Sequence, residues 1–248
     1  MMGVDVKKDT GVKKTKIYEV IIMDVKLLEQ KRNITKLLFK GTDAHFMNTL
    51  RRKIMAGTPI LAVEDVHFYE NNSVMFDEML ASRLGLIPLK MDSKQYKRGD
   101  KVKLVLEKEG PCTVYSKDIK STDPKIEPAE LNIPITILSE GQKIKIEMDA
   151  IVGLGKDHVK HQPAIISYQE IPIINGKSYQ ADVIEKLLDE KQRDFIVDKN
   201  EKIDYDPTAF IFTVESHGNL NAKELFMEAI RELKEKTKEF KGELKNLS

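Results

Sequence analysis

The sequence contains one cysteine, Cys112, no tryptophan, and few aromatic residues, which make up 6% of its 248 residues. One cysteine excludes a disulfide within the chain and any zinc or iron–sulfur site held mainly by its own cysteines. No run of about 18 apolar residues occurs, so no transmembrane helix is expected. Residues 1–16 lack the apolar segment of a signal peptide, and a cytoplasmic location is therefore expected.

Neither sign of charge is in clear excess. The chain has 41 basic and 40 acidic residues, which give a net charge of +1. A protein that binds nucleic-acid phosphates by itself usually carries a marked basic excess. The balance of charge therefore argues against an autonomous nucleic-acid-binding module. With 41% hydrophobic and 33% charged residues, the chain is expected to be globular with a heavily charged surface.

The N-terminal part of the chain predicts a β-hairpin followed by a helix. Residues 17–28 and 34–41 are rich in aliphatic and β-branched residues and flank the polar stretch "EQKRN", which is typical of an antiparallel hairpin. A helix is then predicted from a cap at Thr42 or Asp43 to Gly57. Its expected core face consists of three apolar residues at helical spacing, Met47, Leu50 and Ile54.

The C-terminal part predicts a strand followed by a long helix. Residues 209–216 alternate as a strand does, and Asn221 with Glu224 forms a capping box that opens the helix. Apolar residues then recur at heptad-type spacings, interrupted by Thr237, and this pattern predicts contact with a partner helix. These apolar residues, named here the helix seam, are Phe226, Ile230, Leu233, Phe240 and Leu244.

Short strand-like runs separated by proline, glycine and charged clusters fill the middle of the chain, with one short helix at 75–84. The pattern predicts an α+β protein with a discontinuous unit, an antiparallel sheet with two helices, formed by residues 14–59 plus 207–248. A β-rich domain, residues 60–168, is inserted into it. The highly charged residues 169–206 form a third segment.

Several motifs that suggest chemistry have structural interpretations that fit better. "GLGKDH", residues 153–158, has two glycines spaced as in a dinucleotide loop, but it lacks the third glycine, and no Gly-Lys-Ser/Thr follows. His158 and His161 have no third metal ligand nearby except Asp157, which favours a surface or loop-structuring pair over a metal site.

The short helix also carries charged residues of both signs. Asp77 and Glu78 at its start and Arg83 near its end fit the helix dipole better than acid–base catalysis. No catalytic constellation is recognisable in the sequence. These observations predict a non-catalytic interaction protein, and leave an enzyme of unrecognised type as the alternative.

Three ordered segments carry a resemblance to a known family. Residues 46–89, "FMNTLRRKIMAGTPILAVEDVHFYENNSVMFDEMLASRLGLIPL", closely resemble the signature of the alpha-like subunit of cellular RNA polymerases, in its archaeal form. Residues 153–164 and 206–236 resemble the second and third family segments. The similarity covers most of the chain from Ile17 onward.

The resemblance implies that the discontinuous unit is a dimerisation domain, which pairs with the smaller subunit L through its helices. The heterodimer is the platform for subunits N and P and for the two large catalytic subunits, so DNA is contacted only indirectly. Four residues are assigned by the resemblance to the docking of a large subunit: Asn48, Arg51, Arg52 and Arg83. Three more are assigned to a docking loop for another subunit: His158, Lys160 and Pro163.

The resemblance has one departure and one alternative. Some archaeal relatives carry an iron–sulfur insertion, but residues 169–206 contain no cysteine, so a reduced third domain without a cofactor or metal is expected. The alternative to the heterodimer is a homodimer of the bacterial alpha type. The match to "ENNSVMFDE" and "RLGLIPL" favours the heterodimer.

Overall fold

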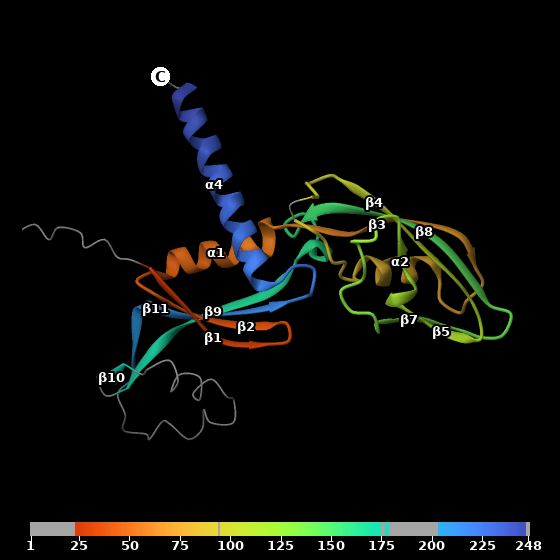
Figure 1. The fold of residues 1–248 in the computed structure, drawn as a ribbon, viewed down its shortest axis with the longest axis horizontal. Coiled ribbons are helices and arrows are strands. Elements are labelled where there is room, and N and C mark those ends of the chain that lie inside the picture. Colours follow the sequence, from red (N-terminus) through yellow and green to blue (C-terminus); the bar gives the residue numbers. More distant parts are fainter. Residues whose placement is uncertain (1–22, 94, 175–176, 179–202, 247–248) are drawn as a thin grey trace, which may run out of the picture.

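The computed structural model describes residues 23–93, 95–174, 177–178 and 203–246, arranged as two lobes along the long axis (Figure 1). The helix–sheet lobe has five strands, β1 (Asp24–Lys31), β2 (Ile34–Lys40), β9 (Ala164–Ile174), β10 (Lys177–Ser178) and β11 (Ile203–Ser216). Its helices are α1 (Ala44–Gly57) and α4 (Ala222–Asn246).

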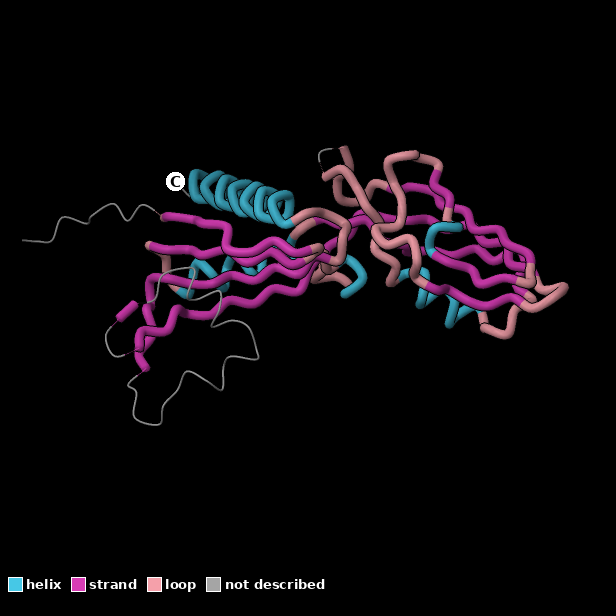
Figure 2. The backbone as a smooth tube through the Cα atoms, turned by 60° about the horizontal axis from the view of Figure 1, so that its bottom comes forward, coloured by secondary structure: helices cyan, strands magenta, loops and turns pink. Residues whose placement is uncertain are grey.

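The β-rich lobe holds the intervening elements, β3 (Pro59–Asn71), α2 (Asp77–Gly85), β4 (Lys101–Glu109), β5 (Cys112–Tyr115), β6 (Lys120–Ser121), β7 (Pro134–Leu138) and β8 (Lys143–Leu154). Its sheets have the orders β3-β8-β4-β6 and β5-β7. A 3-10 turn, η2 (Val159–His161), precedes β9. Figure 2 shows the loops gathered between the two lobes. The molecule is therefore α+β, as predicted.

Strands from distant parts of the chain share the sheet of the helix–sheet lobe. Its order is β1-β2-β11-β9-β10, and every neighbouring pair is antiparallel. Leu38 of β2 pairs with Ile211 of β11. The Asn33 side-chain amide donates to the Ser216 carbonyl at 3.0 Å, across 183 residues of sequence. The predicted hairpin of β1 and β2 is confirmed, although its turn is shorter than expected because residues 29–31 of "EQKRN" continue β1. Residues 17–22 of the first run lie outside the described residues.

The boundary expected between residues 168 and 169 is corrected by the structure. It falls inside β9, where Tyr168 pairs with Phe212 of β11, so β9 belongs to the sheet of the helix–sheet lobe. The alternation of residues 164–171 identifies a strand but not the sheet that the strand joins. Most of the expected third domain, residues 175–176 and 179–202, lies outside the described residues. The described ends of that segment extend β9 and β11.

The predicted helix starts are confirmed. The Asp43 carboxylate caps α1 by accepting a hydrogen bond from the Phe46 amide at 2.7 Å. At α4 the capping box is reciprocal, because the Asn221 amide donates to Glu224 at 2.8 Å and the Glu224 amide donates to Asn221 at 3.0 Å. The core face of α1 is buried as predicted: Met47, Leu50 and Ile54.

An aromatic cluster joins this sheet to α4. The ring centroid of Phe212 in β11 lies 5.7 Å from that of Phe39 in β2 and 5.5 Å from that of Phe226 in α4. These separations suit favourable tilted aromatic pairs. The cluster fixes the first turns of α4 on the sheet, where Leu225 and Ala229 are also buried.

Candidate functional site

The second half of α4 leaves the body of the molecule. Figure 1 shows the helix projecting from the sheet toward its C-terminal end, and every residue from 234 to 246 is exposed. Within the helix seam, Phe240 is 64% exposed and Leu244 is 50% exposed, whereas Leu233 is half-buried. Exposed apolar side chains that share one face of a helix form a candidate interaction surface.

Phe226 differs from the exposed seam residues Phe240 and Leu244. Its ring packs against Phe39 and Phe212 and is partly buried by this chain alone. The burial of this ring therefore comes from the chain's own sheet and not from the predicted partner helix. Heptad spacing predicts which face of the helix is apolar. It does not predict which residues on that face pack on the chain's own sheet.

An open apolar groove of about 690 Å³ lies between α1, α4 and the first two strands. β1 contributes Val25 and Leu27, which are 49% and 53% exposed, because neither helix extends over this edge of the sheet. α4 contributes Met227 at 62% exposure and Ile230 at 38%. Since Ile230 belongs to both the groove and the helix seam, the apolar surface of the groove leads into the seam.

The two arginines of α1 have different environments. Arg51 is half-buried and donates through Nη2 to the Asn48 side-chain oxygen at 3.2 Å. Its Nε is buried and has no hydrogen-bond partner among the described residues. Arg52 is exposed. A buried donor without a partner costs free energy, so the Arg51 guanidinium favours an additional acceptor.

Arg83 lies in the other lobe, on α2, and the structure does not bring it together with Asn48, Arg51 and Arg52 (Figure 1). Its Nη2 donates to the Pro134 carbonyl of β7 at 2.7 Å. The arginine therefore ties α2 to a neighbouring strand. It borders a cleft that also contains exposed apolar side chains, including Phe76 and Ile137 at 73% and 70% exposure.

The two glycines of "GLGKDH" have structural roles. A Cβ on Gly155 would lie 2.2 Å from the Met55 carbonyl oxygen, so only glycine fits against the last turn of α1. The next residue, Lys156, donates its backbone amide to the Ala56 carbonyl at 3.1 Å. The loop thus satisfies the C-terminus of α1. The missing third glycine argues against a dinucleotide loop, and this packing explains why a glycine stands at position 155.

The other glycine and the histidines form one structured loop. A Cβ on Gly153 would lie 2.5 Å from Nε2 of the buried His161 ring. His161 Nδ1 donates to the Ile60 carbonyl at 2.8 Å, and burial lowers the pKa of its imidazole. Lys160 pairs with Glu64 at 2.6 Å, and His158 Nδ1 accepts from the Lys160 amide at 3.1 Å. The loop-structuring interpretation of the histidines fits this geometry.

The docking-loop residues differ in accessibility. His158 is exposed and Lys160 is half-buried, whereas Pro163 is buried and its carbonyl accepts from the His217 amide at 2.9 Å.

Within the described part of the chain, no group of three or more His, Cys, Asp or Glu side chains is arranged to hold a metal ion. In the same residues, no helix is long and apolar enough to cross a membrane.

Replacing Gly155 with alanine is expected to lower the free energy of unfolding by about 1–3 kcal/mol, because the new methyl group must displace backbone at the end of α1. Urea denaturation of the full chain measures this change. Gly242→Ala is the matched control, since a Cβ there meets nothing within 4 Å and alanine favours helix. Equal stabilities for the two variants would contradict the proposed role of the loop.

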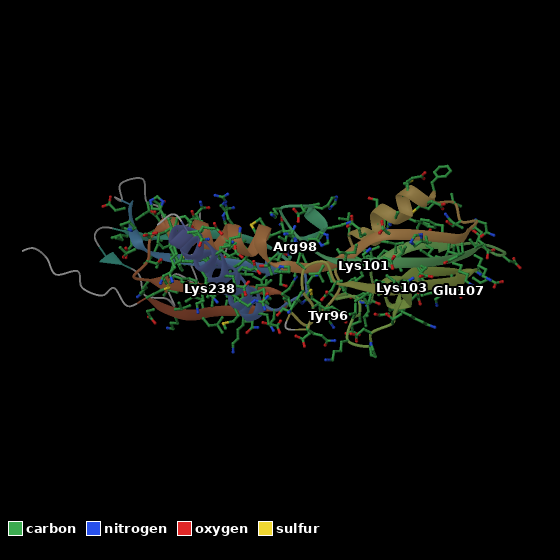
Figure 3. The ribbon with its side chains drawn as sticks, turned by 90° about the horizontal axis from the view of Figure 1, so that it is seen from above. Tyr96, Arg98, Lys101, Lys103, Glu107 and Lys238 are labelled. Carbon is green, nitrogen blue, oxygen red and sulfur yellow. The ribbon has the colours of Figure 1, made fainter. Side chains whose placement is uncertain are left out.

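The outer face of the β-rich lobe carries both lysines and carboxylates. Figure 3 labels Lys101, Lys103 and Glu107, which follow one another along β4. Lys103 forms an ion pair with Glu147 of β8, and Arg98 pairs with Asp157 at 3.2 Å. Because the charges of both signs are interspersed, this face does not form the basic stripe expected for nucleic-acid binding.

Asn219 is a buried contact between the lobes that the sequence interpretation missed. Its side-chain amide donates to the Leu89 carbonyl at 2.9 Å, and its own carbonyl accepts from the Met91 amide at 3.5 Å. This turn therefore holds the "GLIPL" segment against the end of β11. The only sequence signal was the turn-forming pair Gly218–Asn219 after a strand.

Comparison with known proteins identifies the family. The model of the RNA polymerase Rpb3/RpoA insert domain matches residues 66–174. The DNA-directed RNA polymerase subunit Rpo3 of Pyrococcus furiosus is 35% identical, over 91% of this chain and 98% of its own length. The same subunit of Thermococcus kodakarensis is 34% identical, over 92% of this chain and 100% of its own length. That of Natronomonas pharaonis is also 34% identical, over 83% of this chain and 91% of its own length. The chain belongs to the family of archaeal DNA-directed RNA polymerase subunit Rpo3.

Proposed function

We propose that this chain is a non-catalytic assembly subunit that pairs with the small alpha-like subunit L. The observation that supports this is the apolar surface of the groove and the helix seam. It includes Leu27 and Phe240, which are more than half exposed in the single chain. Burial of apolar surface favours association, so a partner helix along this surface is the arrangement that fits.

The heterodimer is proposed to be the platform on which subunits N and P and the two large catalytic subunits assemble. Docking of a large subunit is assigned to Asn48, Arg51 and Arg52 on one lobe and Arg83 on the other. The loop of His158, Lys160 and Pro163 is assigned to another subunit. In this proposal the chain contributes no catalytic residue, binds no cofactor, and contacts DNA only through the assembled enzyme.

Light scattering of the purified chain, alone and mixed with subunit L from the same source, tests the pairing. The chain alone is expected to have the mass of a monomer, about 28.4 kDa, and the mixture that of a one-to-one complex. A chain that is dimeric alone and does not bind subunit L would contradict the proposal and support the homodimer of the bacterial alpha type.

The double variant Arg51→Ala, Arg52→Ala is expected to keep its fold and its pairing with subunit L but to recruit a large subunit less well. Both arginines lie outside the buried face of α1, so little core packing is lost. Truncating a desolvated interface arginine can cost about 2 kcal/mol or more, roughly thirtyfold in affinity. Reconstitution at limiting subunit concentration measures it.

Arg98→Ala is the matched control, because Arg98 is exposed and forms only a surface ion pair with Asp157. If the Arg51→Ala, Arg52→Ala variant recruits the large subunit as well as the control does, both arginines belong to a solvated helix face.

A further inference from the structure

Three lysines meet where α1, α4 and the loop after β8 come together. Lys53 lies in the last turns of α1, Lys156 follows the loop that closes this helix, and Lys236 lies on α4, which packs against α1. Among the described residues, none of the three forms an ion pair within 4 Å, although many other lysines of the chain do. We name these residues the lysine cluster.

The Lys53 side chain follows α1 toward its C-terminus. Its Nζ lies 4.0 Å, and its Cδ 3.4 Å, from the position that a Cβ on Gly57 would occupy. A helix C-terminus favours a cation, which offers a purely structural reason for a lysine here. That reason is insufficient, because burial and the neighbouring Lys236 ammonium lower the pKa of Lys53, with Lys156 adding to the repulsion. Glu232 offsets only part of it.

The cluster is continuous with the helix seam. Lys236 lies three residues after Leu233 and four before Phe240, and residues at these spacings are neighbours on a helix surface. A partner helix that packs along the seam therefore passes over Lys236 and approaches the end of α1. The positive charge of the three lysines, which Glu232 offsets only in part, lies at the edge of an apolar interface and favours an acidic group on the partner.

We propose that the lysine cluster binds a carboxylate of the partner helix that packs along α4, and so fixes the register of that helix. This inference rests on the proposed pairing. A protein carboxylate fits better than a nucleic-acid backbone, because α4 also carries Glu232, Glu235 and Glu239, which would repel a run of phosphates. A single carboxylate can bind to the lysine ammonium groups without lying along these glutamates.

The test uses the full chain with Lys53→Gln and Lys236→Gln combined. The affinity for subunit L is expected to fall about tenfold at low salt, and the dependence of that affinity on salt is expected to weaken. The thermal midpoint of the isolated double variant is expected to be equal to or higher than that of the wild type, because repulsion between ammonium groups is removed. An unchanged affinity, or a lower midpoint, would overturn the inference.

Lys238→Gln is the matched control on the same helix (Figure 3). Lys238 is two residues beyond Lys236, about 200° around α4, and is also exposed. Its replacement is expected to leave both measurements unchanged. An equal loss of affinity in the control would show that the affinity depends on the total charge of α4 and not on the lysine cluster, and would overturn the inference.

Two further outcomes separate this inference from the proposed function. If the wild-type chain does not bind subunit L, the proposed function fails and the inference fails with it. If the wild type binds subunit L and the double variant binds it equally well, only the inference fails. A 20-base-pair DNA duplex is the second probe, and loss of duplex binding with intact pairing would assign the cluster to phosphates instead.

Discussion

Replacing Phe240 with glutamate is expected to abolish co-purification with subunit L while leaving the thermal unfolding of the isolated chain almost unchanged. Phe240 is 64% exposed, so its replacement removes little packing within the chain. In the proposed complex the new carboxylate would be buried against apolar side chains. A buried charge without a partner costs about 3–5 kcal/mol, which is about a hundredfold or more in Kd.

Lys238→Glu is the control for this prediction. It introduces the same carboxylate two residues away, on the opposite side of α4, and is expected to retain pairing. Recovery of subunit L with Phe240→Glu at the wild-type yield would show that the helix seam is not the interface. A large drop in the thermal midpoint would instead show that Phe240 packs within its own chain.

Truncating Phe212 to alanine is expected to lower the free energy of unfolding by about 3–5 kcal/mol, as measured by urea denaturation. Its ring is fully buried in the central strand β11 and contacts both Phe39 and Phe226. The cavity would loosen the aromatic cluster that holds the first turns of α4. Pairing with subunit L is therefore expected to weaken as well.

Two other variants test whether the loss of stability in Phe212→Ala comes from core packing. Phe212→Leu keeps most of the volume and is expected to cost less than the alanine variant. Phe76→Ala removes the same ring from a side chain that is 73% exposed, and is expected to change stability by less than about 0.5 kcal/mol. Similar losses for Phe212→Ala and Phe76→Ala would contradict the packing described for β11.

Local signals made several elements predictable from the sequence. The cap at Asp43, the buried face of α1 and the reciprocal cap of α4 depend on residues within one or two turns of each other, so spacing alone reveals them. The family segments were recognisable for a related reason. Much of "RLGLIPL" is core, with Leu84, Ile87 and Leu89 buried, and core positions tolerate few substitutions.

Several features that depend on contacts between distant segments were not predictable. The placement of β9 depends on pairing with β11, which the alternation of its own residues does not encode. The lysine cluster arises only where α1 and α4 cross. Arg83 was assigned to the docking of a large subunit, but its contact with the Pro134 carbonyl spans 51 residues of sequence. Such contacts follow from tertiary packing, which one sequence does not show.

The pairing of β2 with β11 has a consequence for the order in which the protein forms during synthesis. Asn33 and Ser216 are 183 residues apart, so β2 and the apolar face of α1 must wait for most of the chain to leave the ribosome. The β-rich lobe, contiguous from Pro59 to Leu154, can close earlier because its contacts are nearer in sequence. The exposed seam on α4 is translated after both, so the nascent chain gains its partner-binding surface only when its own sheet is ready to close.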